Sequence, residues 1–175
     1  MGIIVVYNSK TGFTKRYADW IAEELSCSVL SYKDFSNDAA SGSDTIIFGS
    51  YVHAGKIASL SKMKSYCQDH PEKKLVVFAT GAAPLTAKDA VNRIWSENFT
   101  QAEREAIPHF YLQGGLSYEK MGFFDRTAMK AVASLMSKKR AKDKEDAGFA
   151  QAIKSSYDVS SKEFITSLVD HVQSL

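Results

Sequence analysis

The chain has 175 residues, of which 45% are hydrophobic and 24% charged, and this composition fits one globular domain over residues 1–175. Its net charge of +2 is too small to indicate a nucleic-acid partner. We find no apolar run long enough to span a bilayer and no secretory leader pattern, and the two cysteines and four histidines lack metal-ligand spacing. We therefore expect a cytoplasmic protein with reduced thiols and no metal site.

The first informative segment is a turn that follows the apolar run at residues 3–7 and precedes a helical pattern at residues 14–25. A helix N-terminus presents free N–H groups and the positive end of the helix dipole, which together attract anions. Hydroxyl side chains and a glycine in the turn add hydrogen bonds and allow close backbone approach. The turn therefore predicts a site for a terminal phosphate monoester, and an ordinary capped turn is the alternative. The candidate residues are Ser9, Lys10, Thr11, Gly12, Phe13 and Thr14.

Five apolar runs alternate with helical segments along the chain. The runs lie at residues 3–7, 28–32, 45–48, 75–79 and 109–113, and the helices at residues 14–25, about 58–69, about 87–99 and 160–169. Continuous apolar runs are typical of parallel strands buried on both faces. The alternation predicts a doubly wound α/β fold with a five-stranded parallel sheet in the order 2-1-3-4-5.

Ligands of such sheets bind beyond the carboxyl ends of the central strands, where the strand order reverses. Two loops rich in small residues follow the third and fourth strands, and their backbone amides are able to reach a flat polar ring. Tyr51 or His53 is a candidate to stack on that ring, the alternative being ordinary surface positions for both. The candidate contacts in these loops are Ser50, Tyr51, Val52, His53, Gly55, Thr80, Gly81, Ala82 and Ala83.

An insertion at about residues 116–158 separates the fifth strand from the last helix. Apolar residues at helical spacing within it, Phe124, Ala128, Ala131 or Val132, and Leu135, predict an amphipathic helix over residues 123–136. We expect this helix to pack on the body of the domain and to wall the substrate side of the ligand site, with a second subunit or a membrane as alternatives. A basic run at residues 137–142 follows and fits a solvated helix end, although peripheral contact with an anionic membrane through residues 123–142 is also open.

Four segments together resemble one branch of the flavodoxin superfamily, the menaquinone-dependent, oxygen-independent protoporphyrinogen oxidase-like proteins. The first is the S-x-T-G-x-T pattern of residues 9–14, shared by flavodoxins in general, and the second is the pair of glycines at positions 49 and 55. The other two are specific to the branch: Gly-Gly-Leu-x-Tyr at residues 114–118, and Phe-Asp-Arg at residues 124–126 followed by Met129 and Lys130.

The resemblance implies a bound FMN, with its phosphate in the first loop and a peptide at Gly55 that changes orientation with the redox state of the flavin. It also implies an FMN-dependent oxidoreductase that acts on a quinone or a small-molecule substrate. A flavodoxin-type electron carrier that serves a redox partner protein is the alternative. Such carriers are strongly acidic, whereas this chain has a net charge of +2, which favours the enzyme.

Overall fold

The computed structural model describes residues 2–138 and 151–175. The strands are β1 (Ile3–Asn8), β2 (Ser28–Ser31), β3 (Thr45–His53), β4 (Lys56–Ile57), β5 (Lys74–Gly81), β6 (His109–Gln113), β7 (Gly115–Leu116) and β8 (Tyr157–Asp158). The α-helices are α1 (Phe13–Leu25), α2 (Asn37–Ala40), α3 (Leu60–Asp69), α4 (Lys88–Asn98), α5 (Gln101–Ala106), α6 (Phe123–Lys138) and α8 (Thr166–Gln173). Three short 3-10 helices are η1 (Tyr32–Asp34), η2 (Tyr118–Lys120) and η3 (Lys162–Ile165).

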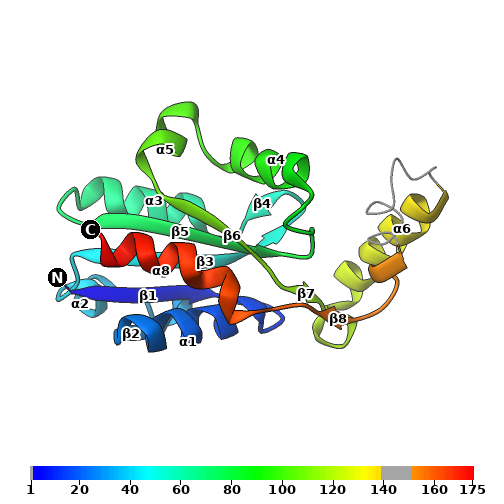
Figure 1. The fold of residues 1–175 in the computed structure, drawn as a ribbon, viewed down its shortest axis with the longest axis horizontal. Coiled ribbons are helices and arrows are strands. Elements are labelled where there is room, and N and C mark those ends of the chain that lie inside the picture. The colour runs from blue at the N-terminus through cyan, green and yellow to red at the C-terminus, as the bar shows by residue number, and fades with distance from the viewer. Residues whose placement is uncertain (1, 139–150) are drawn as a thin grey trace.

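Five strands form a parallel sheet in the order β2-β1-β3-β5-β6, and β4 adds to β3 in antiparallel fashion. Counted without the short β4, this is the predicted order 2-1-3-4-5, so the sequence-based prediction of the fold is confirmed. The carboxyl ends of β1, β3 and β5 lie next to one another at one edge, which Figure 1 shows facing the insertion. This edge is the predicted ligand site of a doubly wound sheet.

The sheet is covered by helices on both faces (Figure 1). Successive strand residues point to opposite sides, so Val5 belongs to one buried cluster and Val6 to the other. Helices α1 and α8 contribute to the cluster on the Val5 face, and α3 and α4 contribute to the cluster on the Val6 face. The central strands β1, β3 and β5 are therefore buried on both sides, which explains why their apolar runs are continuous rather than alternating.

Strand β3 is longer than the sequence predicts. We expected it to end at Phe48 because a glycine follows, but it continues to His53, so Ser50, Tyr51 and Val52 lie on a strand rather than in a loop. The strand has a glycine at position 49 because the ring of Phe78 packs against the backbone there, and an added Cβ would lie 1.9 Å from that ring. The glycine therefore marks a close packing contact, not a strand end.

Helix α5 was not predicted, although its N-terminal signal is present in the sequence. Thr100 and Glu103 form a capping box, in which each side chain accepts a hydrogen bond from the backbone of the other. The predicted last helix also begins later than expected, since residues 162–165 form η3 and α8 starts only at Thr166.

The insertion is closed at its base and extends away from the sheet (Figure 1). Strands β7 and β8 pair in antiparallel fashion, which joins its two ends next to the body. Helix α6 forms where predicted and packs through Met129, Ala133 and Met136 against a small cluster with Leu116 and Ile153.

The prediction that the apolar face of α6 defined by Phe124, Ala128, Ala131 or Val132, and Leu135 packs on the body is wrong for Phe124 and Leu135. Phe124 is 85% exposed and Leu135 62% exposed, because the helix is directed outward and packs instead through buried Ala133 and partly buried Met129 and Met136. Ala128 and Val132, on the same face, border the cavity described below. Residues 139–142 of the predicted basic run lie outside the described residues, so membrane contact through residues 123–142 stays a prediction. Within the described part of the chain, no helix is both long and apolar enough to cross a bilayer.

Candidate functional site

The turn between β1 and α1 leaves the start of the helix open. Gly12 precedes the helix with φ 101°, a left-handed conformation that favours glycine, and its N–H donates to Ser9 Oγ at 3.2 Å. No side chain caps α1, and its first turn contains no acidic residue. The free N–H groups of that turn and the helix dipole therefore remain available to an anion.

Thr14 has a different environment from the other hydroxyl residues of this turn. Its side chain is buried, and its Oγ1 lies 2.7 Å from Oγ1 of Thr80 at the end of β5. Ser9 and Thr11 are only partly buried. Thr14 thus ties the first turn to the end of β5, two segments that the sequence analysis assigned to opposite ends of one ligand.

The end of β3 and the short β4 form a hairpin where we expected an irregular loop. Val52 pairs with Ile57 and His53 with Lys56, which leaves Ala54 and Gly55 as a two-residue turn. Both turn residues have positive φ, 48° and 79°, as a type I′ turn requires. Asn98 at the end of α4 fixes the hairpin, because its Nδ2 donates to the carbonyl of Gly55 and its Oδ1 accepts from the N–H of Ile57.

Two tyrosines position the segment after β5. Tyr111 donates to the carbonyl of Ala83 at 3.0 Å, and Tyr157 of the insertion donates to the carbonyl of Ala82 at 2.9 Å. Burial raises the pKa of Tyr157 to about 12 and raises the pKa of Tyr111 as well, so both hydroxyls stay protonated donors at neutral pH. The insertion therefore holds part of the candidate ring site in place.

A cavity of about 360 Å³ lies between the strand ends and the insertion. Most of the predicted site residues line it: Lys10, Thr11, Phe13, Tyr51, Val52, His53, Thr80, Gly81, Ala82 and Ala83. The insertion supplies a largely apolar opposite wall, made of Leu116, Met121, Asp125, Ala128, Met129 and Val132. Ser9, Gly12, Thr14, Ser50 and Gly55 do not line this cavity, and they lie on the segments that form its border.

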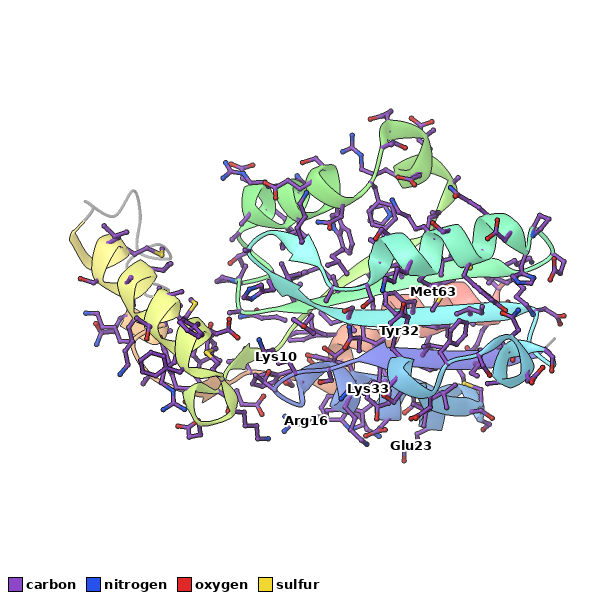
Figure 2. The ribbon with its side chains drawn as sticks, turned by 180° about the vertical axis from the view of Figure 1, so that it is seen from behind. Lys10, Arg16, Glu23, Tyr32, Lys33 and Met63 are labelled. Carbon is purple, nitrogen blue, oxygen red and sulfur yellow. The ribbon has the colours of Figure 1, made fainter. Side chains whose placement is uncertain are left out.

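Asp125 connects the first turn of α6 to both candidate loops. It forms an ion pair with Lys10, and its Oδ1 lies 3.8 Å from His53 Nε2. Figure 2 shows Lys10 at the end of the sheet beside the insertion. The hydrogen bond from Lys10 lowers the pKa of Asp125, and the same bond raises the pKa of Lys10.

The sign of these two shifts defines the pH range of the contact. The lowered pKa of Asp125 makes its contribution complete above the ordinary value of 3.8 and lost as the pH falls through the lowered pKa. The raised pKa of Lys10 makes its contribution complete below 10.5 and lost as the pH rises through the raised pKa. The insertion therefore stays linked to the first loop across the neutral range.

Comparison with known proteins identifies the family. The family model described as a flavodoxin domain matches residues 4–144, most of the chain. The chain belongs to the flavodoxin family. No curated protein sequence matches it.

Similar solved structures include three flavodoxins. A flavodoxin from the Archaea has 16% identity and a TM-score of 0.39, with 88% of this chain and 94% of that chain covered. A WrbA-like flavodoxin from Agrobacterium tumefaciens has 16% identity and a TM-score of 0.43, with 87% and 94% covered. Oxidised flavodoxin 2 from Bacillus cereus has 18% identity and a TM-score of 0.39, with 87% and 97% covered.

A flavodoxin domain implies a flavin cofactor, typically FMN. In this flavodoxin the sequence analysis missed residues that position the site: Asn98, Tyr111, Tyr157 and Asp125. No three metal-ligating side chains come together within the described residues, and Cys27 and Cys67 are free and partly buried.

Proposed function

We propose that this flavodoxin binds FMN without a covalent bond and acts as an FMN-dependent oxidoreductase. One observation supports the proposal above all others: an uncapped helix start and an apolar cavity share one edge of the sheet. A helix start suits a terminal phosphate. The adjoining space suits a flat ring, because its small residues let the backbone approach the ligand.

The residues on this edge fit the phosphate of FMN. Helix α1 lacks a cap and an acidic first turn, so a phosphate dianion at this turn meets N–H donors and no carboxylate of the helix, while the nearby carboxylates of Asp125 and Asp158 are paired with Lys10 and Arg16. Ser50 lies beside Asn8 in the sheet, and its Oγ is buried without a hydrogen-bond partner among the described residues, but it does not line the cavity. The fit to a phosphate therefore rests on the open N–H groups at the start of α1 and on the partly buried hydroxyls of Ser9 and Thr11.

The proposal assigns two groups of contacts. Residues 9–14 would hold the phosphate, while residues 50–53, Gly55 and residues 80–83 would surround the ring. When bound, FMN supplies reversible one- and two-electron redox chemistry. The chain's own contribution is to bind the phosphate, to orient the ring against β3 and β5, and to exclude water on the side of the insertion.

The finer part of the proposal concerns the substrate. The apolar wall formed by Leu116, Met121 and Met129 favours a small molecule over a partner protein as the reacting species. A protoporphyrinogen oxidase-like activity linked to a quinone agrees with the segments at residues 114–118 and 124–130. In each cycle a substrate would lose two electrons and two protons, and a quinone would gain the same number to become a quinol.

The test has two stages. Flavin released by heat from the purified full chain should chromatograph as FMN, and the apoprotein should bind FMN in preference to FAD or riboflavin. Mainly FAD, or no flavin after reconstitution, would contradict the cofactor assignment. The holoprotein is then titrated anaerobically with a menaquinone analogue and a porphyrinogen in turn. Failure with both, together with electron exchange with a redox protein, would favour the electron carrier.

A further inference from the structure

A second hollow, of about 310 Å³, lies on the outer side of the first loop. It is bordered by Thr11, Gly12 and Arg16 from that loop and helix α1, and by Ser117 and Lys120 from the insertion. The ammonium nitrogen of Lys120 lies next to Gly12, because a Cβ added to this glycine would meet the nitrogen at 3.5 Å. The insertion thus brings a positive charge to the turn that we propose as the phosphate site.

The other cations around this turn are already paired. Lys10 is paired with Asp125, Lys15 with Asp19, and Arg16 with Asp158. Lys120 differs from them, because its ammonium group forms no hydrogen bond or ion pair within residues 2–138 and 151–175. The nearby carboxylate of Glu119 instead accepts from the hydroxyls of Ser117 and Ser156.

We propose that Lys120 is an electrostatic partner of the FMN phosphate, supplied by the insertion rather than by the sheet. This inference rests on the proposed function. A phosphate dianion at the start of α1 would give Lys120 the opposite charge that it lacks, and a lysine acts at such a site as a compact point charge. The insertion would then distinguish FMN from riboflavin, in addition to forming the wall of the cavity.

The position of Lys120 in the chain allows this role. It ends the short helix η2, which follows β7 directly, and the N–H of Tyr118 donates to Ser156 Oγ across the base of the insertion. The hydroxyl of Tyr118 donates to the carbonyl of Ile153 at 2.5 Å, which fixes the turn from its other side. Lys120 is therefore carried by an anchored turn, although its own side chain is exposed.

The test compares Lys120→Gln with Lys130→Gln, a control that removes an exposed lysine from α6 away from both hollows. Dissociation constants for FMN and riboflavin are measured on the full-chain apoproteins by flavin fluorescence. Lys120→Gln should weaken FMN binding about fivefold, the size expected of an exposed ion pair, and leave riboflavin binding unchanged. It should also reduce the dependence of FMN affinity on salt. Lys120→Arg should restore both.

The outcomes separate this inference from the proposed function. If the wild-type chain binds no flavin, the proposed function fails. If the wild type binds FMN and Lys120→Gln binds it equally well, the inference is overturned. Equal loss of FMN and riboflavin would also overturn it, because that result indicates a structural role. As a second readout, FMN but not riboflavin should protect the amides of residues 118–121 from hydrogen exchange.

Discussion

At the scale of single residues, the threonine hydroxyls of the first loop have two different environments. Thr11 lines the cavity and is only partly buried, whereas Thr14 is buried and bonded to Thr80. Both threonines belong to the same S-x-T-G-x-T segment, and the sequence alone does not show that one is buried and the other lines the cavity. The partner of Thr14 lies 66 positions away, at the end of a strand whose register only the folded sheet defines.

Replacing both threonines tests the phosphate assignment. A hydrogen bond to a charged phosphate contributes roughly 1.5–3 kcal/mol, so the double variant Thr11→Ala/Thr14→Ala should bind FMN more than tenfold more weakly and remain folded. Thr14→Ala alone should also lower the free energy of unfolding by about 1–3 kcal/mol, because it leaves the Thr80 hydroxyl buried and unpaired. Fluorescence titration and urea unfolding measure the two effects. Unchanged FMN affinity in the double variant would place the phosphate elsewhere.

The same scale shows why some site residues escape sequence-based prediction. Residues 9–14 are adjacent in the chain and follow a strand, so their pattern is visible in the sequence. Asp125 and Lys120 reach the same loop from more than a hundred positions away, through an insertion that the β7–β8 pairing and the Tyr157–Ala82 hydrogen bond hold next to the body. Contacts between segments this far apart in the sequence cannot be predicted when they depend on a pairing as short as that of β7 and β8.

At the scale of elements, the insertion differs most from expectation. Its helix was predicted from a stripe through Phe124 and Leu135, yet those side chains are exposed, and the helix packs instead through Ala133, which is buried, and Met129 and Met136, which are partly buried. Helix α6 has apolar residues on more than one face, and periodicity alone does not decide which face finds a partner. The burial depends on Ile153 and Tyr157, which come from the second half of the insertion, after the helix.

Removing the insertion tests its role in turnover. Replacing residues 118–155 with a short Gly-Ser bridge keeps β7 and β8, whose residues Leu116 and Tyr157 are paired. We expect FMN binding within about tenfold of the wild type, since only exposed ion pairs to the cofactor are lost, and no turnover with quinone or porphyrinogen because the apolar wall is gone.

Circular dichroism and FMN titration serve as the controls for this deletion. Loss of FMN and fold together would mean that the insertion is part of the core. Turnover that survives would mean that the part of the wall formed by Met121 and Met129 is not needed, and it would support the electron-carrier alternative.

At the scale of the whole molecule, the sheet is the part that the sequence predicts best. Its central strands β1, β3 and β5 are continuous apolar runs because they are covered on both faces, whereas the edge strand β2 is partly exposed and gives a weaker pattern. The helices between the strands require parallel connections. The ends of strands are less predictable. Gly49 looks like a strand end in the sequence but lies in the middle of β3, because Phe78 occupies the space where a side chain would be.

The architecture also predicts how the cofactor affects stability. The proposed contacts come from the ends of β1, β3 and β5, which are neighbours in one sheet, and from the insertion. Unfolding would destroy all of them together, so FMN should bind the folded chain alone. At a free concentration one hundred times the dissociation constant, such a ligand stabilises the folded state by about 2.7 kcal/mol. For a chain of this size that corresponds to a rise in Tm of about 5–10 °C.

Thermal unfolding with FMN and with riboflavin at the same concentration measures the effect of the phosphate. Riboflavin should raise Tm much less, because it lacks the phosphate that we propose the start of α1 and its hydroxyls bind. Adding inorganic phosphate with riboflavin is the matched control for a general ion effect. Equal shifts with FMN and riboflavin would show that binding depends on the ring alone, and the first loop would then be an ordinary turn rather than a phosphate site.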